Sequence, residues 1–203
     1  MRKHPHKVHA AFTFFRRRAS GRMWYTCHME KKVYLDARDY LRDMWRLARQ
    51  VLDSGWRPDV LLALWLGVAV HEYLKVQGVS VRHMPIKCSS YTGIGTSNAK
   101  VKFEHADGVL AQLKPGTKVL VVDDVFDTGR TAAAVHERLA ALGCDMRMAC
   151  VYWKPEKNVT PYKPDFHVRT LDRWIVFPHE IEGLTPAEIA EKDEVLAALM
   201  KIK

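Results

Sequence analysis

The chain has 203 residues, of which 48% are hydrophobic and 27% are charged, as expected for one globular domain with its own core. A membrane helix needs about 20 consecutive apolar residues, and no apolar run in the sequence is that long, which argues against a membrane protein. The net charge of +9 suggests nucleic acid as a partner, but the distribution of that charge argues against it.

The basic charge is concentrated in residues 1–22. Seven of the 32 Lys and Arg residues lie there without any Asp or Glu, which leaves 25 basic and 23 acidic residues in 23–203. Such a segment is typical of a disordered arm, of a targeting peptide, or of translation begun upstream of a true start at Met23. We expect a disordered basic tail over 1–22 and a single domain over 23–203. Nucleic-acid binding by the tail would rest on charge alone.

The four cysteines are scattered and show no C-x-x-C spacing, and no cysteine or histidine cluster resembles a zinc site. Without a secretory signal, this pattern favours buried thiols in a reducing cytoplasm.

Predicted strands and helices alternate along the chain. The periodicity of Leu41, Met44, Trp45, Ala48 and Leu52 predicts an amphipathic helix over 36–52. The later elements are a strand at 59–65, a helix at 67–76, a strand at 81–87, a flexible loop at 88–100, a strand at 118–122, a helix at 132–142, strands at 146–153, 166–170 and 174–177, and a helix from Pro186. This order predicts an α/β fold of three layers, with a mainly parallel central sheet and helices on both faces.

The segment from 121 to 131 reads V-V-D-D-V-F-D-T-G-R-T, a buried strand that ends in acids and leads into a helix. Ligands of such sheets bind at the carboxyl ends of strands. Backbone N–H groups at the helix start, with the hydroxyls of Thr128 and Thr131, can hold a phosphate. A strand followed by an Asx turn and a capped helix accounts for one acid and one threonine. It does not account for three acids, a glycine and two threonines.

This segment resembles the phosphoribosyl-pyrophosphate (PRPP) signature of type I phosphoribosyltransferases. The resemblance implies that Asp123 and Asp124 hold ribose hydroxyls, directly or through Mg²⁺, and that Asp127 is the general base near the purine N7. It also implies that the 5′-phosphate is bound by Thr128, Gly129, Arg130 and Thr131.

The second half of the chain resembles the purine end of hypoxanthine, guanine and xanthine salvage enzymes. Lys154 matches the lysine that donates to the purine 6-oxo group, and Trp174 matches the aromatic residue that stacks on the base. Ile175 would offer its backbone carbonyl to the ring edge, and Glu180 falls where the family has an acid on the magnesium side, usually Asp. This resemblance implies a small C-terminal hood and purine-binding segment. Taken singly, a tryptophan like Trp174 is more often a core residue and a lysine like Lys154 more often a solvated strand end, but their joint spacing favours the site.

Residues 89–95 resemble the mobile hood that closes over the substrates, and its expected contacts are Ser90, Tyr91 and Thr92. Closure would exclude water, which would otherwise hydrolyse PRPP.

The sequence departs from the family after the first strand. The family's pyrophosphate loop has an Arg or Lys followed by Gly-Gly, often with a Pro beyond, and this Arg-Gly-Gly-x-Pro segment is missing between Trp65 and Leu66. Pyrophosphate is the leaving group, so the gap bears on catalysis. Two explanations are open: an impaired or ligand-sensing relative, or loss of the loop from this particular sequence.

The sequence thus predicts a cytoplasmic purine phosphoribosyltransferase of purine salvage. It would join hypoxanthine, guanine or xanthine to PRPP with Mg²⁺, giving the nucleoside 5′-monophosphate and pyrophosphate. Relatives commonly form dimers or tetramers, so a homodimer or homotetramer is expected. The alternative is a catalytically impaired regulatory protein that binds a nucleotide or PRPP in the same pocket.

Overall fold

The structure is a computed structural model that describes residues 8–19, 22–64, 67–91, 100–104 and 106–201. The chain divides into two compact units, and each is described by itself. The larger unit comprises residues 41–172, and the smaller one comprises residues 1–40 together with 173–203. None of the helices described is long and apolar enough to cross a membrane.

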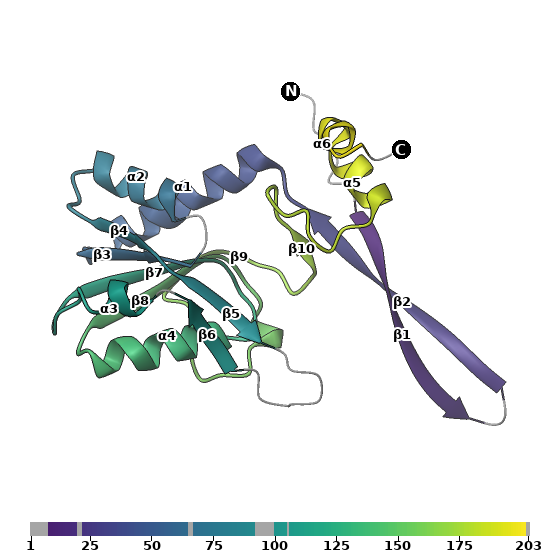
Figure 1. Cartoon of the computed structure of the whole chain (residues 1–203), viewed down its shortest axis with the longest axis horizontal. Helices are drawn as coiled ribbons and strands as arrows, with labels where there is room; N and C mark the ends of the chain where they lie inside the picture. The colour runs from purple at the N-terminus through teal and green to yellow at the C-terminus, as the bar shows by residue number, and fades with distance from the viewer. Residues whose placement is uncertain (1–7, 20–21, 65–66, 92–99, 105, 202–203) are drawn as a thin grey trace. The chain divides into compact units, whose positions relative to one another are not determined.

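The larger unit is built on a parallel sheet of five strands in the order β4-β3-β7-β8-β9 (Figure 1). The strands are β3 (Val60–Ala63), β4 (Arg82–Pro85), β7 (Lys118–Phe126), β8 (Asp145–Trp153) and β9 (Phe166–Thr170). From β3 the chain moves outward to β4, whereas from β7 it moves the other way to β8 and β9. The order therefore reverses between β3 and β7, and the carboxyl ends of these neighbours form the crevice where such sheets bind ligands.

Helices cover both faces of this sheet. Figure 1 shows α1 (Ala37–Asp53) and α2 (Val68–Val76) on one side of it, with α3 (Asp107–Leu110) and α4 (Arg130–Ala141) on the other. This arrangement confirms the predicted α/β fold with a mainly parallel sheet and two helical layers.

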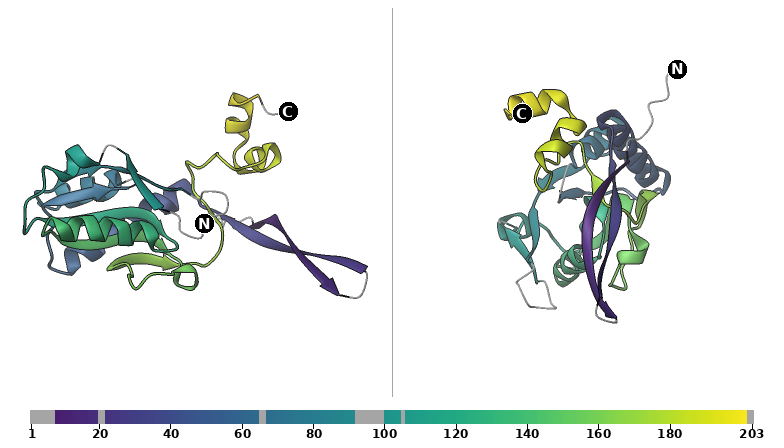
Figure 2. Two further views of the ribbon diagram at one scale, coloured as in Figure 1. Left: turned by 60° about the horizontal axis from the view of Figure 1, so that its bottom comes forward. Right: turned by 90° about the vertical axis from the view of Figure 1, so that its right-hand side faces the viewer.

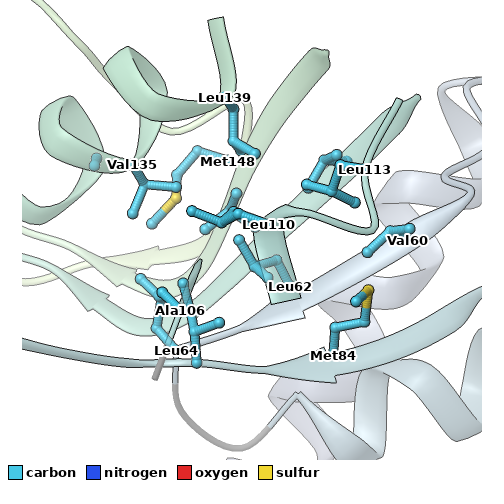
Figure 3. Close-up of a cluster of buried hydrophobic side chains, with 14 of the residues drawn as sticks. Val60, Leu62, Leu64, Met84, Ala106, Leu110, Leu113, Val135, Leu139 and Met148 are labelled. Carbon is cyan, nitrogen blue, oxygen red and sulfur yellow. The ribbon is translucent and has the colours of Figure 1, made fainter. Parts of the chain in front are cut away.

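Alternate residues of β3 serve the two faces. Leu62 and Leu64 join Met148 of β8 and Val135 and Leu139 of α4 in one buried cluster (Figure 3). On the other face, a Cβ added at Gly67 would lie 2.7 Å from Leu61 Cδ2 and 2.6 Å from Ala63 Cβ. Since every second residue of a strand points to the same face, β3 is buried on both of its faces. A glycine at 67 lets the start of α2 pack directly on the strand.

Residues 88–100, predicted to be a flexible loop, are partly strand. β5 (Lys87–Tyr91) pairs antiparallel with β6 (Lys100–Glu104), and residues 92–99 lie outside the described part of the chain. Cys88 lies opposite Phe103 and both pack against the core, while an ion pair of 2.8 Å joins Lys87 to Glu104. Cross-strand packing of Cys88 with Phe103 and the ion pair of Lys87 with Glu104 stabilise the two strands, although the polar composition of the segment had predicted a loop.

The smaller unit contains a second sheet. β1 (Val8–Ala19) and β2 (Arg22–Tyr34) form a twisted antiparallel ribbon (Figure 2), and β10 (Ile175–Val176) lies parallel to β2. Helices α5 (Pro186–Lys192) and α6 (Glu194–Leu199) follow, and Thr185 caps α5.

Residues 8–19 of this ribbon form a strand within the segment for which the sequence predicted a disordered tail over 1–22. Charge argued for disorder, whereas the aromatic and β-branched residues from Phe12 to Phe15 favour an extended strand once β2 is beside them. The single domain over 23–203 stays a prediction.

Candidate active site

The acids after the central strand lie at a pocket. Its volume is about 300 Å³. Every residue from Asp123 to Thr131 lines it, together with Leu64, Cys88, Ala132 and Met148. β7 lies between β3 and β8, so its carboxyl end opens at the place where the strand order reverses. The ten consecutive residues from Asp123 to Ala132, at the end of β7 and the start of α4, thus line the same pocket.

Asp123 and Asp124 form an electrostatically strained pair. Each carboxylate accepts a backbone N–H, Asp123 from Asp124 at 3.0 Å and Asp124 from Val125 at 2.7 Å. Burial, and then the neighbouring Asp124 carboxylate, raise the pKa of Asp123 well above its usual value. Two neighbouring carboxylates that interact in this way are stabilised by a ligand that brings hydroxyl donors or a cation.

Residues 127–131, the phosphate loop, turn from β7 into α4 at Gly129. Gly129 has a φ of +77°, and its carbonyl accepts the N–H of Ala133 at 2.9 Å, so helical hydrogen bonding begins at this residue. No side chain caps α4, which leaves its first N–H groups available to an anion. The loop therefore has the backbone geometry that the predicted phosphate site requires.

A second segment supports the phosphate loop from outside. The Val159 N–H donates to the Thr128 carbonyl at 3.0 Å. Asn158 Oδ1 accepts from both the N–H and the hydroxyl of Thr160 at 3.0 Å, and the Asn158 amide donates to the Tyr162 carbonyl at 2.7 Å. A Cβ at Gly129 would lie 2.4 Å from Thr160 Oγ1 and 2.5 Å from Asn158 Oδ1. Only glycine fits there.

Asn158 to Thr160 were not among the predicted site residues. The run Asn-Val-Thr-Pro at 158–161 is typical of a turn built on side-chain hydrogen bonds. That signal predicts a turn, but it does not show that the turn packs against Gly129.

Lys154 pairs with Asp127 beside the same loop. Its ammonium lies 3.2 Å from Asp127 Oδ2, its backbone N–H donates to the Phe126 carbonyl at 2.9 Å, and the residue is 7% exposed. The other oxygen of Asp127, Oδ1, is buried and receives no hydrogen bond from the described residues. A buried acceptor without a donor suits a ligand that brings one. Lys154 is thus a buried ion-pair partner rather than a solvated strand end.

Three predicted site residues belong to the smaller unit. Trp174 is 45% exposed, and Ile175 is buried. The carbonyls of Trp174 and Val176 accept the N–H groups of Val33 and Leu35, so the Ile175 carbonyl faces the opposite edge of β10. Glu180 Oε2 accepts the Phe177 N–H at 3.1 Å, within its own turn. Across the described residues, no three His, Cys, Asp or Glu side chains gather as a metal site.

The remaining predictions concern segments with little or no description. Ser90 and Tyr91 lie on β5, and their strand pairing is their only described feature. Thr92 falls outside the described residues, as do Trp65 and Leu66, which flank the missing pyrophosphate-loop segment. The roles assigned to these residues stay predictions.

The sheet order, the acids after the central strand and the helix that starts on a glycine define the type I phosphoribosyltransferase fold. The model of the phosphoribosyl transferase domain matches residues 32–183, more than half of the chain, and the chain belongs to that family.

Solved structures share this fold. A purine phosphoribosyltransferase from Pyrococcus horikoshii is 28% identical, with a TM-score of 0.59 over 76% of this chain and 97% of that one. A hypothetical protein from Neisseria gonorrhoeae with bound ppGpp is 22% identical, with a TM-score of 0.62 over 85% and 99%. The second likeness shows the fold alone.

A curated relative is the hypoxanthine-guanine phosphoribosyltransferase of Lactococcus lactis. It is 35% identical over 78 residues, which are 38% of this chain and 41% of that protein. The match therefore spans less than half the length of the relative.

Proposed function

We propose that the protein transfers the phosphoribosyl group of PRPP to a 6-oxopurine, giving a nucleoside 5′-monophosphate and pyrophosphate in purine salvage. The observation that carries this proposal is the ion pair of Lys154 with Asp127 at the phosphate loop. Membership of the family and the purine enzymes among its relatives support it. A cytoplasmic location and a homodimer or homotetramer stay predictions from the sequence.

The phosphate loop would bind the 5′-phosphate of PRPP. The free N–H groups at the start of α4 and the hydroxyls of Thr128 and Thr131 supply donors, and Gly129 lets the backbone come close. Arg130 adds a cation at the helix start. These groups fix C1′ of the ribose relative to the base, which lowers the entropic part of the barrier.

Asp123 and Asp124 would accept the ribose hydroxyls. The two carboxylates, together with oxygens of the substrate, would also suit Mg²⁺ as ligands. This ion usually binds one or two carboxylates together with phosphates. When bound, the ion would share the negative charge of the departing pyrophosphate. Glu180 is proposed on this side from the resemblance alone.

Lys154 and Asp127 would act on the base. The ammonium donates to the 6-oxo oxygen and so favours an oxopurine over adenine, whose 6-amino group is itself a donor. The Asp127 carboxylate takes the proton from N7 as N9 bonds to C1′ and the bond from C1′ to pyrophosphate breaks. Trp174 would stack on the base, and the Ile175 carbonyl would meet its edge.

One assay tests the proposal against its alternative. Purified protein is mixed with Mg²⁺, PRPP and hypoxanthine, guanine, xanthine or adenine, and the product nucleotide is followed by absorbance. Nucleotide formed from an oxopurine supports the transferase. Tight binding of nucleoside monophosphate without turnover would instead support the impaired regulatory relative, which the missing segment after Trp65 motivates.

A further inference from the structure

Trp174 lies beside a buried cation in the smaller unit. Its carbonyl accepts the N–H of Val33 at 2.8 Å, which ties the start of β10 to β2. The preceding residue of β2, Lys32, places its ammonium over the indole, 5.6 Å from the ring centroid. Lys32 is 5% exposed, whereas Trp174 is 45% exposed. One face of the indole therefore lies under the ammonium, while nearly half of the Trp174 surface is open to solvent.

Lys32 is held in this position by α5. Its ammonium lies 2.7 Å from Glu188 Oε1, and Glu188 Oε2 accepts the N–H and the hydroxyl of Thr185 at 2.9 and 3.1 Å. The Glu188 N–H donates back to Thr185 Oγ1 at 3.3 Å, so the carboxylate belongs to the capping box of the helix.

The electrostatics agree with a fixed pair. Burial alone would raise the pKa of Glu188, but the hydrogen bonds from Lys32 and Thr185 outweigh it and the pKa is lowered. An ion pair that is this buried is stable only when its geometry is held by further hydrogen bonds. Lys32 is thus fixed where it lies, unlike a surface lysine.

We propose that Lys32 is a positioning residue for the purine base: it holds the Trp174 indole in the orientation that stacks on the base, and Glu188 holds Lys32. The inference rests on the proposed function. A ring that is already ordered loses little freedom when a planar base binds, so base affinity rises without any contact between Lys32 and the base. The same ion pair links base affinity to the capping of α5.

The first test needs no ligand. The fluorescence of Trp174 is obtained by subtracting the signal of a matched variant that also carries Trp174→Phe, and its quenching by acrylamide is then measured. It is compared for the wild type, Lys32→Met, Lys32→Arg and the control Lys75→Met, an exposed lysine of α2. We expect stronger quenching in Lys32→Met alone. Quenching equal to that of the wild type would overturn the proposal.

The second test is kinetic. In Lys32→Met, the KM for hypoxanthine or guanine should rise about 3- to 10-fold, the scale of ordering one aromatic side chain on binding. The kcat and the KM for PRPP should stay within twofold, and Lys32→Arg should restore the KM. An unchanged base KM, or a fall in kcat alone, would contradict a positioning role.

Two further arms separate the possible failures. If Lys32→Met does not fold, Glu188→Gln replaces it in both tests, and smaller changes in the same direction are expected. Wild-type values for Glu188→Gln would then overturn the proposal. If the wild type forms no nucleotide, the proposed function fails, and the ligand-free quenching still decides whether Lys32 holds the ring.

Discussion

The ammonium of Lys154 lies 3.2 Å from the carboxylate of Asp127, and each residue directly follows one of two neighbouring strands of the parallel sheet. One group can donate to a carbonyl and the other can accept a proton, which are the two polar contacts that an oxopurine needs. The pair joins the chemistry of the base to the loop that would hold the phosphate.

Replacing Asp127 with Asn should lower kcat on the order of 10²-fold, the usual scale for a lost general base, while PRPP binding is largely kept. The amide retains the shape of the side chain but does not take the N7 proton. Single-turnover kinetics and PRPP calorimetry would measure the two effects. Equal losses of turnover and binding would make Asp127 a ligand-positioning residue.

Replacing Lys154 with Ala should abolish the preference for oxopurines and weaken base binding by roughly 1.5–3 kcal/mol, the range for a charged hydrogen bond. Competition between hypoxanthine and adenine would measure the preference. Unchanged affinity for hypoxanthine and guanine would mean that Lys154 serves only its ion pair with Asp127.

Gly129→Ala should weaken PRPP binding and destabilise the fold by more than Gly78→Ala. Both glycines have a positive φ, but a Cβ at 78 meets nothing within 4 Å, whereas at 129 it overlaps Asn158 and Thr160. The control variant should therefore show only backbone strain, about 1–2 kcal/mol. Urea unfolding and PRPP titration of both variants would check this. Equal losses of stability would show that the Asn158–Thr160 turn moves aside for the added Cβ at little cost in free energy.

Asp123→Asn should make the ligand-free protein more stable at neutral pH. The pKa of Asp123 is raised on folding, so the folded state loses stability as the pH rises above the pKa of an unfolded Asp, and the amide removes this loss. The advantage should disappear below the pKa of an unfolded Asp, about 4. Urea unfolding at several pH values would measure it, together with the expected loss of Mg²⁺-dependent PRPP binding. If the variant were less stable than the wild type at neutral pH, the buried Asp123 carboxyl would not be what destabilises the ligand-free fold.

Restoring Arg-Gly-Gly-Thr-Pro between Trp65 and Leu66 should raise turnover. A lost preorganised electrostatic contact lowers rates roughly 10²–10³-fold, so the gain should be easy to measure. The unaltered chain should bind nucleoside monophosphate far better than pyrophosphate. If it already turns over near the ordinary enzyme median of about 10 s⁻¹, another cation such as Lys87 or Arg130 must meet the leaving group.

Local patterns predicted most of the larger unit. A continuous apolar run that ends in Asp123 and Asp124 indicates a buried parallel strand with a ligand site at its end, and β7 has that form. The Asn158–Thr160 turn was missed because its role comes from contact with Gly129, which lies far away in the sequence. The pair of Asp43 with Arg169, at 2.5 Å, escaped prediction for the same reason. In both cases an ordinary polar residue acquires its role only through tertiary packing.

The contact of Asn158 and Thr160 with Gly129 also bears on the order in which the site is assembled. Because the turn follows β8 in the chain and contacts the phosphate loop, we expect the loop to reach its final shape only once β8 has paired with β7. Local opening that begins at the β8–β9 edge would then dismantle the ligand site while the β3–β7 centre is still intact. A nucleotide held by the loop would in turn stabilise that edge of the sheet, and hydrogen exchange in β8 and β9 would slow when it binds.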